Sequence, residues 1–188
     1  SRRQRQMCIR DSITPRTKLL IMPFPNNPTG AVMEREDLEA IAEVLRDTNV
    51  MVLSDEIYAE LNYGLRPHVS IATLPGMAER TITLNSFSKN FLMTGWRVGV
   101  IIAEPEFLDV MNRINGSLVY SAPSISQRAG IQALAMRKEI REKYVTAYRD
   151  RIFYSADRIE KIPYLSLVRP KGTFYLFPGV EKTGLDDK

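Results

Sequence analysis

Short apolar runs rich in β-branched residues alternate with amphipathic stretches in the first part of this chain, and this alternation restricts the possible folds most strongly. Leu38, Ile41 and Leu45 recur at three- and four-residue intervals, which predicts a surface helix over residues 34–47. The predicted strands are Lys18–Met22, Val50–Leu53, Thr81–Asn85 and Val98–Ala103. Strands separated by helices are typical of an α/β domain with a mainly parallel sheet.

The second half of the chain is mostly helical in its pattern. Helices are expected from Pro105, over residues 124–136 and from Glu139 to about Ile162, where Pro163 ends the last one. Two further strands, Leu165–Val168 and Thr173–Phe177, are expected around a turn formed by Pro170, Lys171 and Gly172. We expect these strands to open a second domain that the chain does not complete.

Composition narrows the chemistry that the chain can carry. The single cysteine, Cys8, excludes an internal disulfide, and the single histidine, His68, argues against a zinc site of the usual kind. Apolar runs such as residues 98–103 are far shorter than the roughly 20 residues of a membrane-spanning helix. We therefore expect no metal site and no membrane partner.

The basic character of the chain has a local source. The formal net charge is +4, but four arginines and one aspartate lie within residues 1–12, so the other 176 residues carry only +1. Nucleic acid is therefore not an expected partner. Residues 6–11 (QMCIRD) resemble the translation of a transposon end used in sequencing libraries, so we interpret residues 1–12 as an artefactual leader.

Polar and ionisable residues follow the predicted strands, at the edge where open α/β sheets bind ligands. Each residue alone has a simpler explanation, such as a turn former, a helix cap, a core aromatic or a solvated charge. Asn27 follows the first strand, Asp55 the second, and Arg97 precedes the fourth. Tyr58 comes three residues after Asp55, and Ser86, Ser88 and Lys89 follow the third strand.

Four motifs occur in a familiar order: Asn26–Gly30 (NNPTG), Asp55–Tyr58 (DEIY), Ser86–Lys89 (SFSK) and Gly95–Gly99 (GWRVG). From about Ile13 to Lys188 the chain resembles the class I/II aminotransferases, which are fold-type I enzymes dependent on pyridoxal 5'-phosphate. The resemblance implies a three-layer αβα large domain, here partial, over residues 13–155. It also implies that residues 156–188 begin a small α+β C-terminal domain.

The same resemblance implies a role for each motif residue. Lys89 corresponds to the amine that holds the cofactor as an aldimine and then moves protons as base and acid. Asp55 corresponds to the carboxylate that keeps the pyridine nitrogen protonated. Tyr58 and Asn27 correspond to the two groups that hydrogen-bond the phenolic oxygen of the cofactor. Ser86, Ser88 and Arg97 correspond to the phosphate ligands.

The implied activity moves an amino group from an α-amino acid to a 2-oxo acid, in a cytoplasmic homodimer. Family members are longer than this chain, so the resemblance also implies a fragment that is inactive by itself. The substrate arginine, the glycine-rich phosphate loop and the aromatic stacking residue are expected outside it. Two alternatives remain open: a carbon–sulfur β-lyase on the same fold, and the effector domain of a transcription regulator that borrowed the fold.

Overall fold

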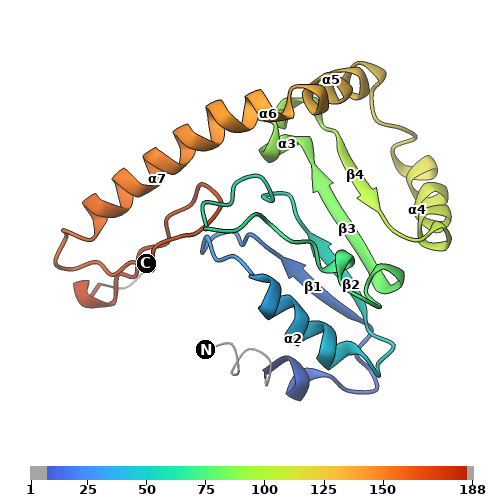
Figure 1. The fold of residues 1–188 in the computed structure, drawn as a ribbon, viewed down its shortest axis with the longest axis horizontal. Helices are drawn as coiled ribbons and strands as arrows, with labels where there is room; N and C mark the ends of the chain where they lie inside the picture. The colour runs from blue at the N-terminus through green and yellow to red at the C-terminus, as the bar shows by residue number, and fades with distance from the viewer. Residues whose placement is uncertain (1–7, 186–188) are drawn as a thin grey trace.

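A single four-stranded sheet organises the computed structural model, which describes residues 8–185 (Figure 1). The first seven residues of the predicted leader and the last three of the chain lie outside the described range. The strands lie in the order β1-β2-β3-β4, with β1 to β3 parallel and β4 antiparallel to β3. They are β1 (Leu19–Pro23), β2 (Met51–Asp55), β3 (Thr81–Ser86) and β4 (Gly99–Ile102). The expected mainly parallel sheet is therefore confirmed.

The register of the sheet places the strand ends at one edge. Asp55 pairs with Pro23 on β1 and with Leu84 on β3. Because β4 runs in the opposite direction, its first residue, Gly99, pairs with Ser86 at the end of β3. The carboxyl ends of three strands and the start of the fourth therefore lie together.

The main core lies between the sheet and helix α2 (Arg35–Leu45). The helix starts with a capping box in which Glu34 and Asp37 satisfy free backbone donors, and it buries its predicted apolar stripe. Leu45 on the helix and Val52 on β2 are fully buried. Burial of a side chain of this size stabilises the fold by about 1.5–3 kcal/mol.

The second half of the described chain is helical, as predicted. Its elements are α4 (Pro105–Leu118), α5 (Ser124–Ala135), α6 (Arg137–Ile140), a π-helical segment (Arg141–Val145) and α7 (Thr146–Ile159). The expected helix over residues 139–162 is thus present with a π-helical turn inside it, and it extends away from the sheet in Figure 1. Short helices are α3 (Phe87–Asn90), η1 (Ile71–Thr73), η2 (Ala78–Arg80), η3 (Thr94–Trp96) and η5 (Glu181–Thr183). None of the described helices is long and apolar enough to pass through a lipid bilayer.

The prediction of two strands near the C-terminus is wrong. In residues 165–177 the structure has only isolated bridges, Ser166 with Gly179 and Asn62 with Gly172. The backbone of residues 171–173 bonds instead to loops that follow β1 and β2, because the N–H groups of Gly172 and Thr173 donate to the carbonyl groups of Gly30 and Leu61. Residues 173–177 (TFYLF), although rich in residues that favour strands, form a loop packed on other loops.

Candidate active site

The polar residues singled out in the sequence gather at the edge where β1 to β3 end. Asp55 is the last residue of β2, and Ser86 is the last residue of β3. Asn27 lies in the loop that follows β1. At the start of this loop the Phe24 N–H donates a hydrogen bond to the Asp55 carbonyl at 3.2 Å, which holds the loop beside the end of β2. Parallel strands in a common register place these three positions on one side of the sheet.

Lys89 lies on the one-turn helix α3, directly after β3. The Ser86 side chain caps this helix, since its Oγ accepts a hydrogen bond from the Ser88 N–H at 3.1 Å. The Lys89 side chain is half-buried, and its Nζ lies 5.5 Å from the centre of the Phe174 ring. An aromatic face stabilises a nearby ammonium group, so Phe174 fixes the position of this amine.

Tyr58 is buried beside the end of β2. The Asp55 Oδ1 accepts a hydrogen bond from the Ile57 N–H at 3.2 Å, which turns the chain so that Tyr58 faces the same edge. Burial raises the pKa of Tyr58, and both Tyr175 and the Asp55 charge raise it further, while a hydrogen bond with Asn27 lowers it. Asn27 and Asp55 are therefore close enough to Tyr58 to change its pKa.

Ser86 and Arg97 meet because β4 returns antiparallel to β3. The Ser86 Oγ donates to the Val98 carbonyl at 3.4 Å, and the Phe87 N–H donates to the same oxygen at 3.3 Å. Arg97 adopts a left-handed conformation at φ 51° and remains exposed, with one guanidinium nitrogen 3.0 Å from the Thr94 carbonyl. The other donors of the guanidinium are free to bind an anion.

The residues present fit the cofactor that the resemblance implies. One edge of the sheet carries an amine (Lys89), a carboxylate (Asp55), a phenol (Tyr58) and an amide (Asn27). The adjoining turn offers two serine hydroxyls and a forked guanidinium, which suit a phosphate group. All seven residues predicted for the site lie at the ends of β2 and β3, on α3 or in the loops that join the strand ends.

Two groups of residues at this edge were not predicted from the sequence. Phe174 and Tyr175 come from the C-terminal loop, and the Tyr175 hydroxyl lies 2.9 Å from that of Tyr58. No local sequence pattern links Tyr58 with Tyr175, which lies 117 positions later in the chain. The two adjacent aromatic residues after the Lys-Gly turn could still have marked this segment as a candidate part of the site.

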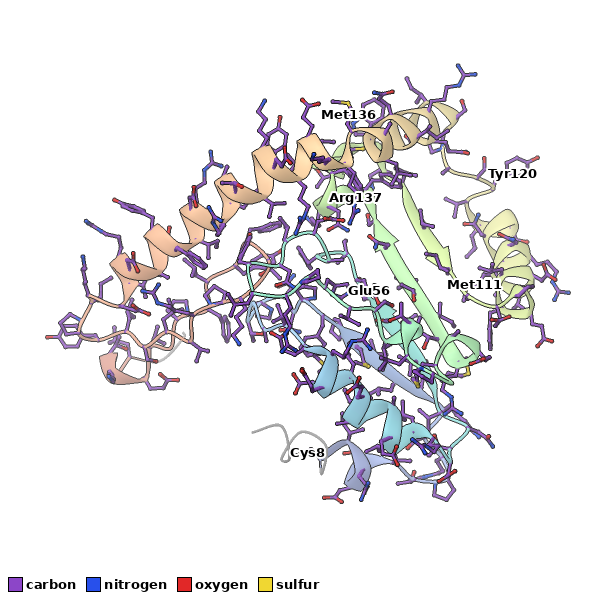
Figure 2. The ribbon with its side chains drawn as sticks, viewed as in Figure 1. Cys8, Glu56, Met111, Tyr120, Met136 and Arg137 are labelled. Atoms are coloured by element: carbon purple, nitrogen blue, oxygen red, sulfur yellow. The ribbon has the colours of Figure 1, made fainter. Side chains whose placement is uncertain are left out.

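The second group surrounds Glu56, which is 4% exposed and adjoins Asp55 (Figure 2). One carboxylate oxygen lies 3.0 Å from the Nε2 of His68, and the other accepts from the Ser54 hydroxyl at 2.9 Å. Burial alone would raise the pKa of Glu56, but the nearby His68 imidazole and the Ser70 and Ser54 hydroxyls outweigh this effect and leave the pKa below its ordinary value. Glu56 thus remains charged and anchors the end of β2.

Asn90 joins the lysine helix to the loop after β2. Its Oδ1 accepts from the Glu60 N–H at 3.1 Å, and its Nδ2 donates to the Asn85 Oδ1 at 2.8 Å. The Glu60 carboxylate in turn binds Arg137 at 2.7 Å and Arg141 at 3.3 Å. The segment that contains Tyr58 is therefore held to α3, to α6 and to the π-helical segment.

Residues 6–187 match the family model described as "Aminotransferase class I and II". An aspartate aminotransferase of Pinus pinaster is 44% identical over 86% of this chain and 34% of its own length. A probable N-acetyl-LL-diaminopimelate aminotransferase of Bacillus subtilis is 40% identical over 94% of this chain and 44% of its own length. The solved aromatic aminotransferase of Pyrococcus horikoshii superposes with a TM-score of 0.89 at 37% identity, covering 94% of this chain and 48% of that structure. The chain therefore spans less than half the length of these relatives.

Proposed function

Since this chain belongs to the class I and II aminotransferases, we propose that the full-length protein moves an amino group from an α-amino acid to a 2-oxo acid. Enzymes of this family depend on pyridoxal 5'-phosphate, whose protonated ring supplies an electron sink for the α-carbon of the substrate. One observation carries the proposal: the amine, the carboxylate, the phenol and the arginine meet at one sheet edge.

Each site residue has a task that its surroundings support. Lys89 would provide the nucleophilic amine that holds the cofactor, and the same amine would move a proton to and from the α-carbon of the substrate. Asp55 would pair with the protonated ring nitrogen of the cofactor. Tyr58 and Asn27 stabilise negative charge on the phenolic oxygen.

The remaining three residues hold the phosphate. Ser86 and Ser88 donate hydroxyl hydrogen bonds, and Arg97 supplies a fixed positive charge with paired donors. Because Ser86 also caps α3, phosphate binding and the position of Lys89 depend on the same short turn.

The two alternative functions find less support. The relatives described above are named aminotransferases that act on aspartate, N-acetyl-diaminopimelate or aromatic amino acids, and none of these names indicates a lyase or a regulator. The proposal includes a homodimer in the cytoplasm and a division of the chain near residue 155 into a large and a small domain.

The test uses full-length protein supplied with pyridoxal 5'-phosphate, an amino acid and 2-oxoglutarate. Glutamate formation supports the proposal, whereas pyruvate and ammonia without glutamate would support a lyase instead. Lys89→Ala is expected to abolish the visible band of the bound cofactor, while Lys138→Ala, at an exposed position on α6, retains it. Asp55→Ala is expected to keep the band and lose most of the turnover. An unchanged band in Lys89→Ala would refute the role of this lysine.

A further inference from the structure

Tyr58 and Lys89 belong to different segments of the chain, yet their side chains share a neighbour. The Lys89 Nζ lies 5.5 Å from the centre of the Phe174 ring, and the Tyr58 ring lies 5.6 Å from the same ring. The pairing of β2 with β3 ends at Asp55 and Leu84, before either Tyr58 or Lys89 is reached. A further contact must therefore set the position of the Tyr58 loop relative to α3.

Asn90, the residue after Lys89, makes this contact through its buried side chain. Its Oδ1 accepts a hydrogen bond at 3.1 Å from the N–H of Glu60, which lies two residues after Tyr58. Its Nδ2 donates to the Asn85 Oδ1 on β3 at 2.8 Å. One side-chain amide therefore joins the Tyr58 loop to the end of β3.

Backbone donors determine the orientation of both side-chain amides. A backbone N–H can only donate, so the atom that faces the Glu60 N–H must be the oxygen of Asn90. In the same way, the Ser86 N–H donates at 2.8 Å to the Asn85 Oδ1, which is therefore an oxygen. If either amide were turned over, two donors or two acceptors would face each other. The direction of each hydrogen bond is thus fixed.

The Tyr58 loop depends on Asn90 for one of its donors. The N–H groups of Ala59 and Leu61 donate to carbonyl groups within the loop, both at 2.9 Å. The partly buried Glu60 N–H between them donates out of the loop, to the Asn90 side chain. A buried donor that loses its acceptor is unfavourable, so removal of the Asn90 oxygen is expected to displace the loop toward water or another acceptor.

The short helix that carries Lys89 has a separate anchor. Phe87, the first residue of α3, is buried in a small apolar core that includes Ala133 of α5. Loss of the Asn90 amide should therefore leave Lys89 in place, while the loop that carries Tyr58 moves.

We propose that Asn90 is a positioning residue that sets the place of Tyr58 relative to Lys89, and with it the hydrogen bond from Tyr58 to the phenolic oxygen of the cofactor. The cofactor part of this inference rests on the proposed function, whereas the contacts of the Asn90 amide do not. Asn90 contacts neither the cofactor nor the reacting atoms in this assignment, because it acts through Tyr58.

The first test uses full-length protein without cofactor and measures hydrogen exchange of the Glu60 amide. Asn90→Leu keeps the size of the side chain and removes both polar atoms, so exchange is expected to become about 10-fold faster. Asn112→Leu, at an exposed position on α4, is the matched control and should leave the rate unchanged. Asn90→Ala removes the same hydrogen bonds and replaces the leucine variant in both tests if that variant does not fold. An unchanged rate would overturn the proposal.

The second test follows the pH midpoint of the visible band in full-length protein loaded with pyridoxal 5'-phosphate. A hydrogen bond from Tyr58 favours the anionic form of the phenolic oxygen, so displacement of Tyr58 is expected to raise the midpoint by about 0.3–1 pH unit. The band itself should persist, because Lys89 stays on α3. Faster exchange with an unchanged or lower midpoint would make Asn90 a purely structural residue. Loss of the band would mean that Asn90 holds Lys89 itself, and either result overturns the proposal.

A double variant tests whether Asn90 acts through Tyr58. In a Tyr58→Phe background, Asn90→Leu is expected to add no shift of the midpoint, and an equal shift there would contradict the proposal. Absence of the band in the unmodified protein would instead refute the proposed function, and with it the cofactor part of the inference. The exchange rate of the Glu60 amide would still decide whether Asn90 holds the loop.

Discussion

Replacement of Glu56 by glutamine is expected to weaken the end of β2 that carries Asp55. The change keeps the shape of the side chain but removes the charge of the carboxylate, one oxygen of which lies 3.0 Å from the His68 Nε2. The charged acceptor of the Ser54 hydroxyl at 2.9 Å is also lost. Hydrogen bonds to a charged group contribute about 1.5–3 kcal/mol each.

The expected loss lies near the lower end of these values. The His68 side chain is 18% exposed, so water partly replaces the missing carboxylate, and the new amide still pairs with Ser54. We expect a loss of about 2–3 kcal/mol, which lowers the melting temperature of a domain of this size by about 4–10 °C. Glu79→Gln on the exposed helix η2 is the matched control, with an expected change within about 0.5 kcal/mol.

The pH dependence tests the cause of the loss. Because the pKa of Glu56 in the folded protein lies below its ordinary value of 4.5, the stabilisation is complete above about pH 4.5 and is lost as the pH falls through the folded value. The gap in melting temperature between wild type and Glu56→Gln is therefore expected at pH 7 and should shrink at pH 3.5. A gap of equal size at both pH values would refute the electrostatic argument.

Three further changes test other parts of the site in full-length protein. Gly30→Ala forces a side chain onto a residue at φ +67° and to within 2.2 Å of a proline Cβ, so we expect a loss of at least about 2 kcal/mol in thermal unfolding. Gly116→Ala, in open space inside helix α4, should instead stabilise by about 0.5–1 kcal/mol. Asn90→Leu leaves the partly buried Glu60 N–H without its acceptor and should cost about 1–3 kcal/mol, with faster amide exchange in the loop after β2. Arg97→Ala should raise the dissociation constant of pyridoxal 5'-phosphate about 10-fold or more, while Arg113→Ala, exposed on α4, leaves it unchanged.

The strand pattern predicted that the candidate residues lie close together, because a parallel sheet places the ends of its strands at one edge. Asp55 and Ser86 could be located as soon as β2 and β3 were recognised, since strand direction alone determines that their ends coincide. The same pattern did not indicate that β4 reverses, and this reversal is what brings Arg97 beside Ser86.

Contacts between distant loops could not be read from local pattern. Residues 173–177 are rich in residues that favour strands, but the Thr173 N–H donates to the Leu61 carbonyl of another loop rather than to a neighbouring strand. His68 carried no signal that it would pair with Glu56, because the partners approach only after the loop from β2 has folded. Such contacts depend on tertiary packing, which overrides local preference.

The reversal between β3 and β4 also restricts how this family member can vary. Lys89 and Arg97 belong to a single short hairpin-like connection, so the gap between the reactive amine and the anion-binding fork is set by the number of residues between them. One inserted or deleted residue in that connection would shift Lys89 relative to Arg97. The solvent-facing connection between α4 and α5 can change length without this effect. Natural variation in length should therefore be scarce from residue 90 to 96 and common around residues 119–123.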